Sequence, residues 1–247
     1  MGGLLKITAL DVSRNSLSSK LPLVPTTLGL LKGLNGLVLN SNNLTGSLPF
    51  ELAQLTGLTY LSTSSNFMTA RVSSIFGQFT RLTYLDLSVN SYSGKIPSDL
   101  GECTRLQNLD LHQNRFTGSV PTEYGQLVDL ASLAFSYDSF SGTVPTEYGQ
   151  LTVVTYLTSS ANSFSGKIPT EYGLLTRLQS LYFDQNSFSG TIPSSLGQLS
   201  ELGSLSLFHN RLTEKIPSSF GQLTGLQYLD MDTNFFEWHD SRCVFIF

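Results

Sequence analysis

A strict period of 24 residues constrains this chain more than any other feature of its sequence. One polar position recurs at that spacing, as Asn42, Asn66, Asn90, Asn114, Asp138, Asn162, Asn186, Asn210 and Asn234. Apolar residues precede it in a fixed frame, for example Leu82, Leu85 and Leu87 before Asn90. A unit of this size can bury its apolar face only against its neighbours, so the sequence predicts one elongated stack of similar units.

An earlier copy of the frame lies 27 residues before Asn42, at Ile7, Leu10, Val12 and Asn15. The three additional residues fit as a loop insertion at Leu23-Val24-Pro25, which leaves the strand frame intact. Ten repeats then span residues 7–234, and 1–247 is predicted to be a single domain. The aromatic residues of 235–247 favour a C-terminal tail or cap over the last apolar edge.

The first half of each unit predicts a short strand, because apolar and polar residues alternate there with a period of two. Neighbouring strands would stack in parallel at about 4.8 Å. The recurring Asn follows the strand where the chain turns inward, so its amide is predicted to bond neighbouring main chains as a ladder. Asp138 interrupts this ladder, because an ionised carboxylate has no hydrogen to donate.

The second half of each unit reads Gly-x-apolar-Pro and then Ser/Thr-x-apolar-Gly-x-apolar, as in 118–125 and 166–173. Proline presets φ, the hydroxyl can cap, and the glycine can end a helical turn in a left-handed conformation. A short helix or 3-10 turn is therefore predicted on the convex side. Two copies depart from the pattern, at Ala70-Arg71-Val72-Ser73 and at Glu214, and both are expected to bend the convex edge locally.

This LTGxIPxxLGxL pattern with its 24-residue period resembles the plant-type leucine-rich repeat family of receptor-like kinases, receptor-like proteins and polygalacturonase inhibitors. The resemblance covers residues 7–234. It implies an α/β repeat solenoid of right-handed coils, with a parallel β-sheet on the concave face and short helical or 3-10 turns on the convex face. It also implies an extracellular or cell-surface location, although no signal peptide or membrane-spanning segment is recognised in the chain.

Composition excludes several classes of function. Charged residues make up 13% of the chain and the net charge is -4, which disfavours a nucleic-acid binder. A hydrophobic share of 40% argues against intrinsic disorder. Cys103 and Cys243 lie too far apart to form a metal knuckle, so no cofactor or metal is expected. Their redox state and the oligomeric state stay open.

The outward strand positions form the candidate ligand-binding surface, which is acidic and rich in tyrosine. Tyrosine suits recognition because it offers a large contact area at a low entropic cost. An open sheet excludes no water and lacks a nucleophile, so the acids and the histidine here point to binding more than to catalysis or a metal site. The candidate ligand-binding residues are Tyr84, Asp86, Asp110, His112, Tyr137, Tyr156 and Tyr182.

The expected function is non-catalytic recognition of a protein or peptide, or of a glycan, as in a receptor-like ectodomain or a fragment of one. A secreted inhibitor resembling the polygalacturonase inhibitors is one alternative. Ice binding is another, because hydroxyls recur at Thr56, Thr80, Thr104, Thr152, Thr176, Ser200 and Thr224, with Val128 between. Three tyrosines in PTEYG copies, Tyr124, Tyr148 and Tyr172, are interpreted as structural. Asn43 begins a glycosylation sequon that is usable if the chain is secreted.

Overall fold

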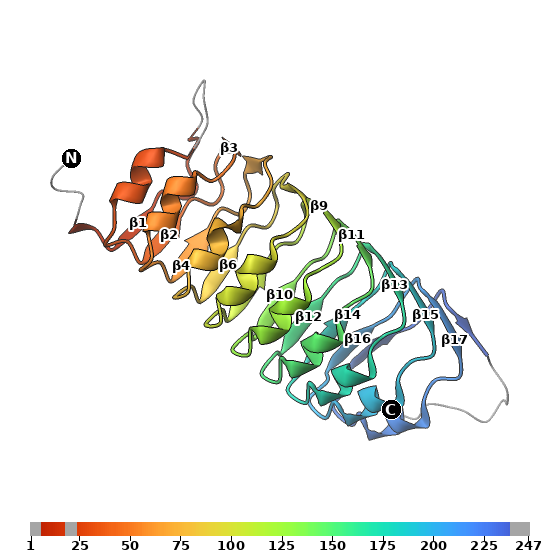
Figure 1. Ribbon diagram of the computed structural model, residues 1–247. Helices are drawn as coiled ribbons and strands as arrows, with labels where there is room; N and C mark the ends of the chain where they lie inside the picture. The colour runs from red at the N-terminus through yellow and green to blue at the C-terminus, as the bar shows by residue number, and fades with distance from the viewer. Residues whose placement is uncertain (1–5, 18–23, 238–247) are drawn as a thin grey trace.

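The computed structural model describes residues 6–17 and 24–237. Within them the chain forms a solenoid whose coils stack side by side from the N-terminal to the C-terminal end (Figure 1). Each coil contributes one strand to a long parallel sheet and one 3-10 turn to the opposite side. The predicted α/β repeat solenoid is confirmed, with all the described helical turns of the 3-10 type.

The concave sheet contains ten parallel strands within the described residues, in the order of the chain. They are β1 (Ala9–Asp11), β2 (Gly36–Val38), β4 (Tyr60–Ser62), β6 (Tyr84–Asp86), β8 (Asn108–Asp110), β10 (Ser132–Ala134), β12 (Tyr156–Thr158), β14 (Ser180–Tyr182), β16 (Ser204–Ser206) and β18 (Tyr228–Asp230). The register pairs equivalent residues of successive repeats, so Asp86 lies opposite Asp110 and Thr158 opposite Tyr182. Residues at the same position of successive repeats, which form a column when the repeats are aligned, therefore lie in one row across the sheet.

A second set of parallel strands follows the ladder position of each coil. Seven of them form one sheet: β7 (Ser93–Gly94), β9 (Arg115–Gly118), β11 (Ser139–Gly142), β13 (Ser163–Gly166), β15 (Ser187–Gly190), β17 (Arg211–Glu214) and β19 (Phe235–Phe236). The strands β3 (Thr45–Gly46) and β5 (Phe67–Met68) pair separately. The strands β5 and β7, on either side of Ala70, do not pair, whereas the sheet continues through Glu214, which keeps a positive φ of 65°. The expected bend of the convex edge at these two sites stays a prediction.

The turns between the two sheets are 3-10 helices of five residues each. They are η2 (Thr26–Leu30), η3 (Phe50–Gln54), η4 (Ser74–Gln78), η5 (Ser98–Glu102), η6 (Thr122–Gln126), η7 (Thr146–Gln150), η8 (Thr170–Leu174), η9 (Ser194–Gln198) and η10 (Ser218–Gln222). The prediction that a Ser or Thr hydroxyl caps the start of each turn is wrong for most of them, because proline occupies the N-cap position. Among these turns only η4 has a side-chain cap, from Ser73, which stands where the other turns have proline.

The glycine found inside every described turn except η3 does not end the turn in a left-handed conformation, contrary to prediction. Its role is close packing: a Cβ at Gly125 would lie 2.7 Å from the backbone oxygen of Glu147 in the next turn. The proposed insertion at 23–25 also needs correction. Pro25 is the N-cap of η2, as Pro49 is of η3, so the additional residues come earlier, between Asn15 and Val24.

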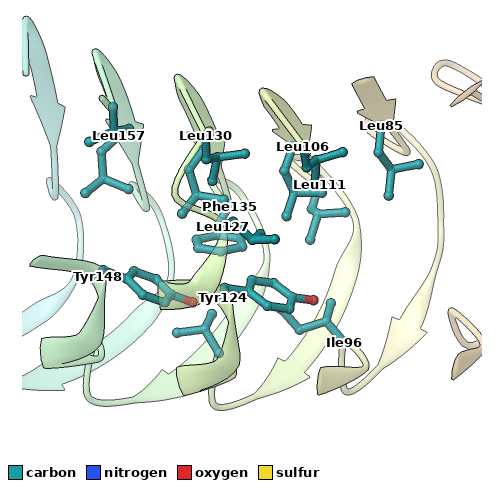
Figure 2. Close-up of a cluster of buried hydrophobic side chains, with 14 of the residues drawn as sticks. Leu85, Ile96, Leu106, Leu111, Tyr124, Leu127, Leu130, Phe135, Tyr148 and Leu157 are labelled. Atoms are coloured by element: carbon teal, nitrogen blue, oxygen red, sulfur yellow. The ribbon is translucent and has the colours of Figure 1, made fainter. Parts of the chain in front are cut away.

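The core runs between the two sheets and the turns, and leucines of successive strands line it (Figure 2). Tyr124 and Tyr148 point inward from their turns and are buried, and Tyr172 is buried likewise. Their hydroxyls donate to the carbonyls of Pro97, Pro121 and Pro145, at 3.0, 3.0 and 3.1 Å. The structural interpretation of these tyrosines is confirmed, since each ties one coil to the coil before it.

The predicted asparagine ladder is present. Asn114, for example, accepts from the backbone N–H of Tyr92 and donates to the carbonyls of Leu87, Leu111 and His112. Such an amide satisfies main-chain groups of two coils at once. The tail proposed as a C-terminal cap lies outside the described residues from 238 onward, as does Cys243.

Candidate functional site

The concave face carries a hollow of about 430 Å³ over the strands β8, β10, β12 and β14. Its lining consists of Asp110, His112, Ser132, Ala134, Ser136, Tyr137, Tyr156, Thr158, Ser160, Tyr182 and Asp184. The hollow contains five of the seven predicted ligand-binding residues: Asp110, His112, Tyr137, Tyr156 and Tyr182. The register of the sheet brings them together, although they come from four different repeats.

Side-chain size explains why the hollow is here. In one row of the sheet, Ala134 and Thr158 stand between the larger Asp110 and Tyr182. In the next row, small hydroxyl residues of the same two repeats stand between His112 and Asp184. Small residues in two central repeats thus form the floor, and larger ones on either side form the walls.

One wall is a hydrogen-bonded acid–histidine pair. The Nδ1 atom of His112 lies 2.6 Å from Oδ1 of Asp110, and both side chains are about one-third exposed. The same oxygen accepts from the backbone N–H of His112 at 3.1 Å. The hydrogen bond to Asp110 raises the pKa of His112, against the opposing effect of burial, and the charges of Asp86 and Asp138 raise it further. This pair therefore favours an imidazolium on this side of the hollow under acidic conditions.

The floor is a chain of buried hydroxyls that ends on the opposite wall. Oγ of Ser136 lies 2.5 Å from Oγ1 of Thr158, which lies 3.4 Å from Oγ of Ser160. Ser160 donates to Oδ1 of Asp184 at 2.6 Å. The other oxygen of Asp184 has no hydrogen bond within the described residues, and it is not buried. A ligand in the hollow can therefore reach a carboxylate oxygen that has no partner.

Aromatic rings form the remaining sides. Tyr137 is 59% exposed and Tyr156 is 38% exposed. The ring of Tyr156 packs edge-on against Tyr182, with centroids 6.0 Å apart. Burial raises the pKa of the Tyr156 hydroxyl, and Tyr182 and Asp110 raise it further. The Tyr156 phenol therefore stays protonated and can donate a hydrogen bond across the physiological range of pH.

Tyr84 and Asp86 lie on the same face but outside the hollow. Tyr84 stacks on Tyr60 with ring centroids 4.3 Å apart, and burial raises its pKa. Oδ1 of Asp86 is occupied by both the backbone N–H and the hydroxyl of Ser88. Asp86 lies opposite Asp110 on the neighbouring strand, but the hollow extends from Asp110 toward β14 and away from Asp86.

Sequence reasoning missed Asp184 and the hydroxyl floor. The signal was present: Asp184 falls in the same column as His112, three repeats later. Thr158 and Ser160 look like generic surface hydroxyls until the register places them beside two tyrosines and a carboxylate. Their common surface becomes visible only when residues at neighbouring positions of the repeat are considered together in the folded sheet.

Several other features of the sequence lie outside the hollow. Cys103 is a free, buried thiol whose pKa burial raises to about 12, so it is a core residue. The described residues contain no group of three His, Cys, Asp or Glu residues that could hold a metal ion. No helix in the described part of the chain is long and apolar enough to cross a membrane. Asn43 and the threonine row from Thr56 to Thr224 are exposed.

Family models described as leucine-rich repeats match residues 176–236, 81–103 and 105–127. A comparison with curated proteins finds no match. Among solved structures, the ectodomain of the Arabidopsis thaliana receptor kinase GASSHO1/SCHENGEN3, in complex with CASPARIAN STRIP INTEGRITY FACTOR 2, is 36% identical with a TM-score of 0.89. The alignment covers 93% of this chain and 27% of that one.

Two further structures show the range of these similarities. The Arabidopsis receptor kinase HAESA, in complex with the peptide hormone IDA and the co-receptor SERK1, is 30% identical with a TM-score of 0.89, and the match covers 94% of this chain and 38% of that one. A plant ice-binding protein is 26% identical with a TM-score of 0.77, over 92% of this chain and 72% of that one. The chain thus spans well under half the length of the receptor ectodomains that it matches.

Proposed function

We propose that this chain, which belongs to the plant-type leucine-rich repeat family, is a non-catalytic recognition module that binds a peptide or protein in its concave hollow. The observation that carries this proposal is the group of half-exposed tyrosines beside the unpartnered oxygen of Asp184. Exposed aromatic rings on a rigid sheet are surfaces that gain energy when a partner covers them.

The similar receptors support a peptide ligand in particular. The HAESA complex contains a peptide hormone, and so does the complex of the receptor RGFR1 with RGF2. By analogy we propose an extracellular, receptor-like role for the present chain, with Asn43 exposed and open to glycosylation in that compartment. A glycan is a less favoured ligand, and inhibition of a wall glycosidase has no specific support in the geometry.

The contact residues that we propose are Tyr84, Asp86, Asp110, His112, Tyr137, Tyr156 and Tyr182, extended by Asp184. The double variant Tyr156→Ala/Asp110→Ala should abolish binding of a protein or peptide that the wild-type chain retains in a pull-down, because it removes two sides of the hollow. The matched variant Tyr228→Ala/Asp230→Ala changes the same residue types on β18, outside the hollow, and should leave that binding intact. Unchanged affinity in the first variant, with its fold preserved, would show that the ligand binds elsewhere.

A second candidate function is ice binding, and one observation favours it. The strands β9, β11, β13 and β15, with the residues that directly follow three of them, present an array of exposed or half-exposed hydroxyls. The array consists of Thr117, Ser119, Ser139, Ser141, Thr143, Ser163, Ser165, Ser187, Ser189 and Thr191. The similarity to a plant ice-binding protein points the same way. This array is broader than the single row from Thr56 to Thr224.

A further inference from the structure

The hydrogens of the hydroxyl floor all point in one direction. Each hydroxyl has a single hydrogen. The one on Ser160 is donated to Asp184, so Ser160 accepts from Thr158. The hydrogen of Thr158 is then used, and Ser136 must donate to Thr158. In this arrangement the hydrogens of the chain are directed along the sheet toward Asp184, and the hydroxyls keep lone pairs that a ligand in the hollow can use.

The carboxylates add further acceptors to this floor. Oδ1 of Asp184 and Oδ1 of Asp110 are already engaged, but the second oxygen of each has no hydrogen bond within the described residues. The lining includes no lysine or arginine side chain. A ligand group that settles on the floor must therefore bring several hydrogen-bond donors, and the free oxygen of Asp184 favours a group that is positively charged.

The aromatic walls favour the guanidinium of arginine over the ammonium of lysine as the group that binds here. The rings of Tyr156 and Tyr182 both line the hollow and are inclined to each other by 62°. A planar guanidinium stacks on a tyrosine face and spreads five N–H donors over neighbouring acceptors. An ammonium is a compact, strongly hydrated charge that matches this spread of acceptors less well.

We propose that the hollow over β10, β12 and β14 is a guanidinium pocket that takes one arginine side chain of the ligand. This inference rests on the proposed recognition function and names the residue that the site selects. The arginine donates to the free oxygen of Asp184 and to lone pairs of Thr158 and Ser136, with its plane against Tyr156. His112 stands on the opposite wall, and its protonation opposes the bound cation.

The test uses N-acetyl-arginine methylamide as a probe and follows the labelled ring signals of the ten tyrosines by NMR. Binding should shift the Tyr156 and Tyr182 signals with a dissociation constant in the millimolar range. The citrulline analogue keeps the shape but lacks the charge, and it should bind at least about tenfold more weakly. The variant Asp184→Asn should weaken arginine binding by about tenfold or more. Asp11→Asn removes a carboxylate at the far end of the same sheet and should leave arginine binding unchanged.

Equal shifts with arginine and citrulline, or no shift at Tyr156 and Tyr182, would overturn the guanidinium pocket. The recognition function is judged separately, by selecting peptides from a random display library on the whole chain. Selected peptides that lose binding in Tyr156→Ala/Asp110→Ala yet show no enrichment of arginine leave the recognition function standing and reject the pocket. Arginine enrichment that disappears when selection is repeated on Asp184→Asn supports both.

Discussion

At the scale of single residues, Asp138 is the clearest conflict between a side chain and its place in the fold. Its Oδ1 accepts from the backbone N–H of Phe116 at 2.8 Å, as the asparagines of the other repeats do. Its Oδ2 takes the place of an amide nitrogen and is buried without a partner. Burial raises the pKa of Asp138 to about 8, partly offset by the two backbone hydrogen bonds and by His112.

The variant Asp138→Asn should stabilise the protein, and more so at high pH. Because the pKa of Asp138 is higher in the folded state than in the unfolded chain, its contribution to folding is fully present below about pH 4 and is lost as the pH rises toward 8. We expect the free energy of unfolding to rise by about 1–3 kcal/mol at pH 8, with a difference that shrinks toward pH 4. Urea denaturation at several pH values measures this.

The reciprocal variant Asn162→Asp is the control for Asp138→Asn. It places a carboxylate at the next ladder position, where the amide now donates to the carbonyls of Phe135, Ser159 and Ser160. It should destabilise the protein with the same dependence on pH. A gain from Asp138→Asn that is equal at pH 4 and pH 8 would mean that ionisation is not the cause.

At the scale of elements, the contact between successive 3-10 turns depends on a glycine that allows close approach. Where Ala53 replaces this glycine, η3 and η4 contact each other far less than the other neighbouring turns do. The second-sheet strands of these two coils, β3 and β5, nevertheless pair; the break in that sheet lies one coil later, between β5 and β7. The methyl group of Ala53 therefore coincides with weaker packing between these two turns, which is the effect that an added Cβ predicts.

The variant Gly125→Ala should destabilise the protein by about 1–3 kcal/mol, since its Cβ would lie within 3 Å of the backbone of Glu147. Gly221→Ala is the matched control: it occupies the same position in η10, and an added Cβ there has nothing within 4 Å among the described residues. Its effect should stay within about 0.5 kcal/mol. Chemical denaturation of both variants decides the point, and equal losses would mean that alanine disfavours the turn itself.

At the scale of the whole molecule, the period of 24 residues was sufficient to predict the architecture, because stacking identical units converts sequence columns into rows on a surface. The same logic found Asp110, His112 and Tyr156, which stand out chemically within their columns. It did not find Asp184 or Thr158, since their role arises from hydrogen bonds between rows. The role of the turn glycine was predicted wrongly, because both close packing against a neighbouring backbone and a positive φ require glycine, and the sequence does not distinguish the two.

The molecule as a whole presents two periodic surfaces, the concave sheet with its hollow and the hydroxyl array on the second sheet. A measurement of thermal hysteresis tests whether the second surface binds ice. We expect none above that of buffer, because the hydroxyl array spans only four strands, about 14 Å, and Arg115 and Lys167 project among the hydroxyls. A charged ammonium holds its own hydration shell and breaks the regular water layer that ice requires. Hysteresis that persists in Tyr156→Ala/Asp110→Ala but disappears in Ser163→Lys would instead make ice binding the function of this chain.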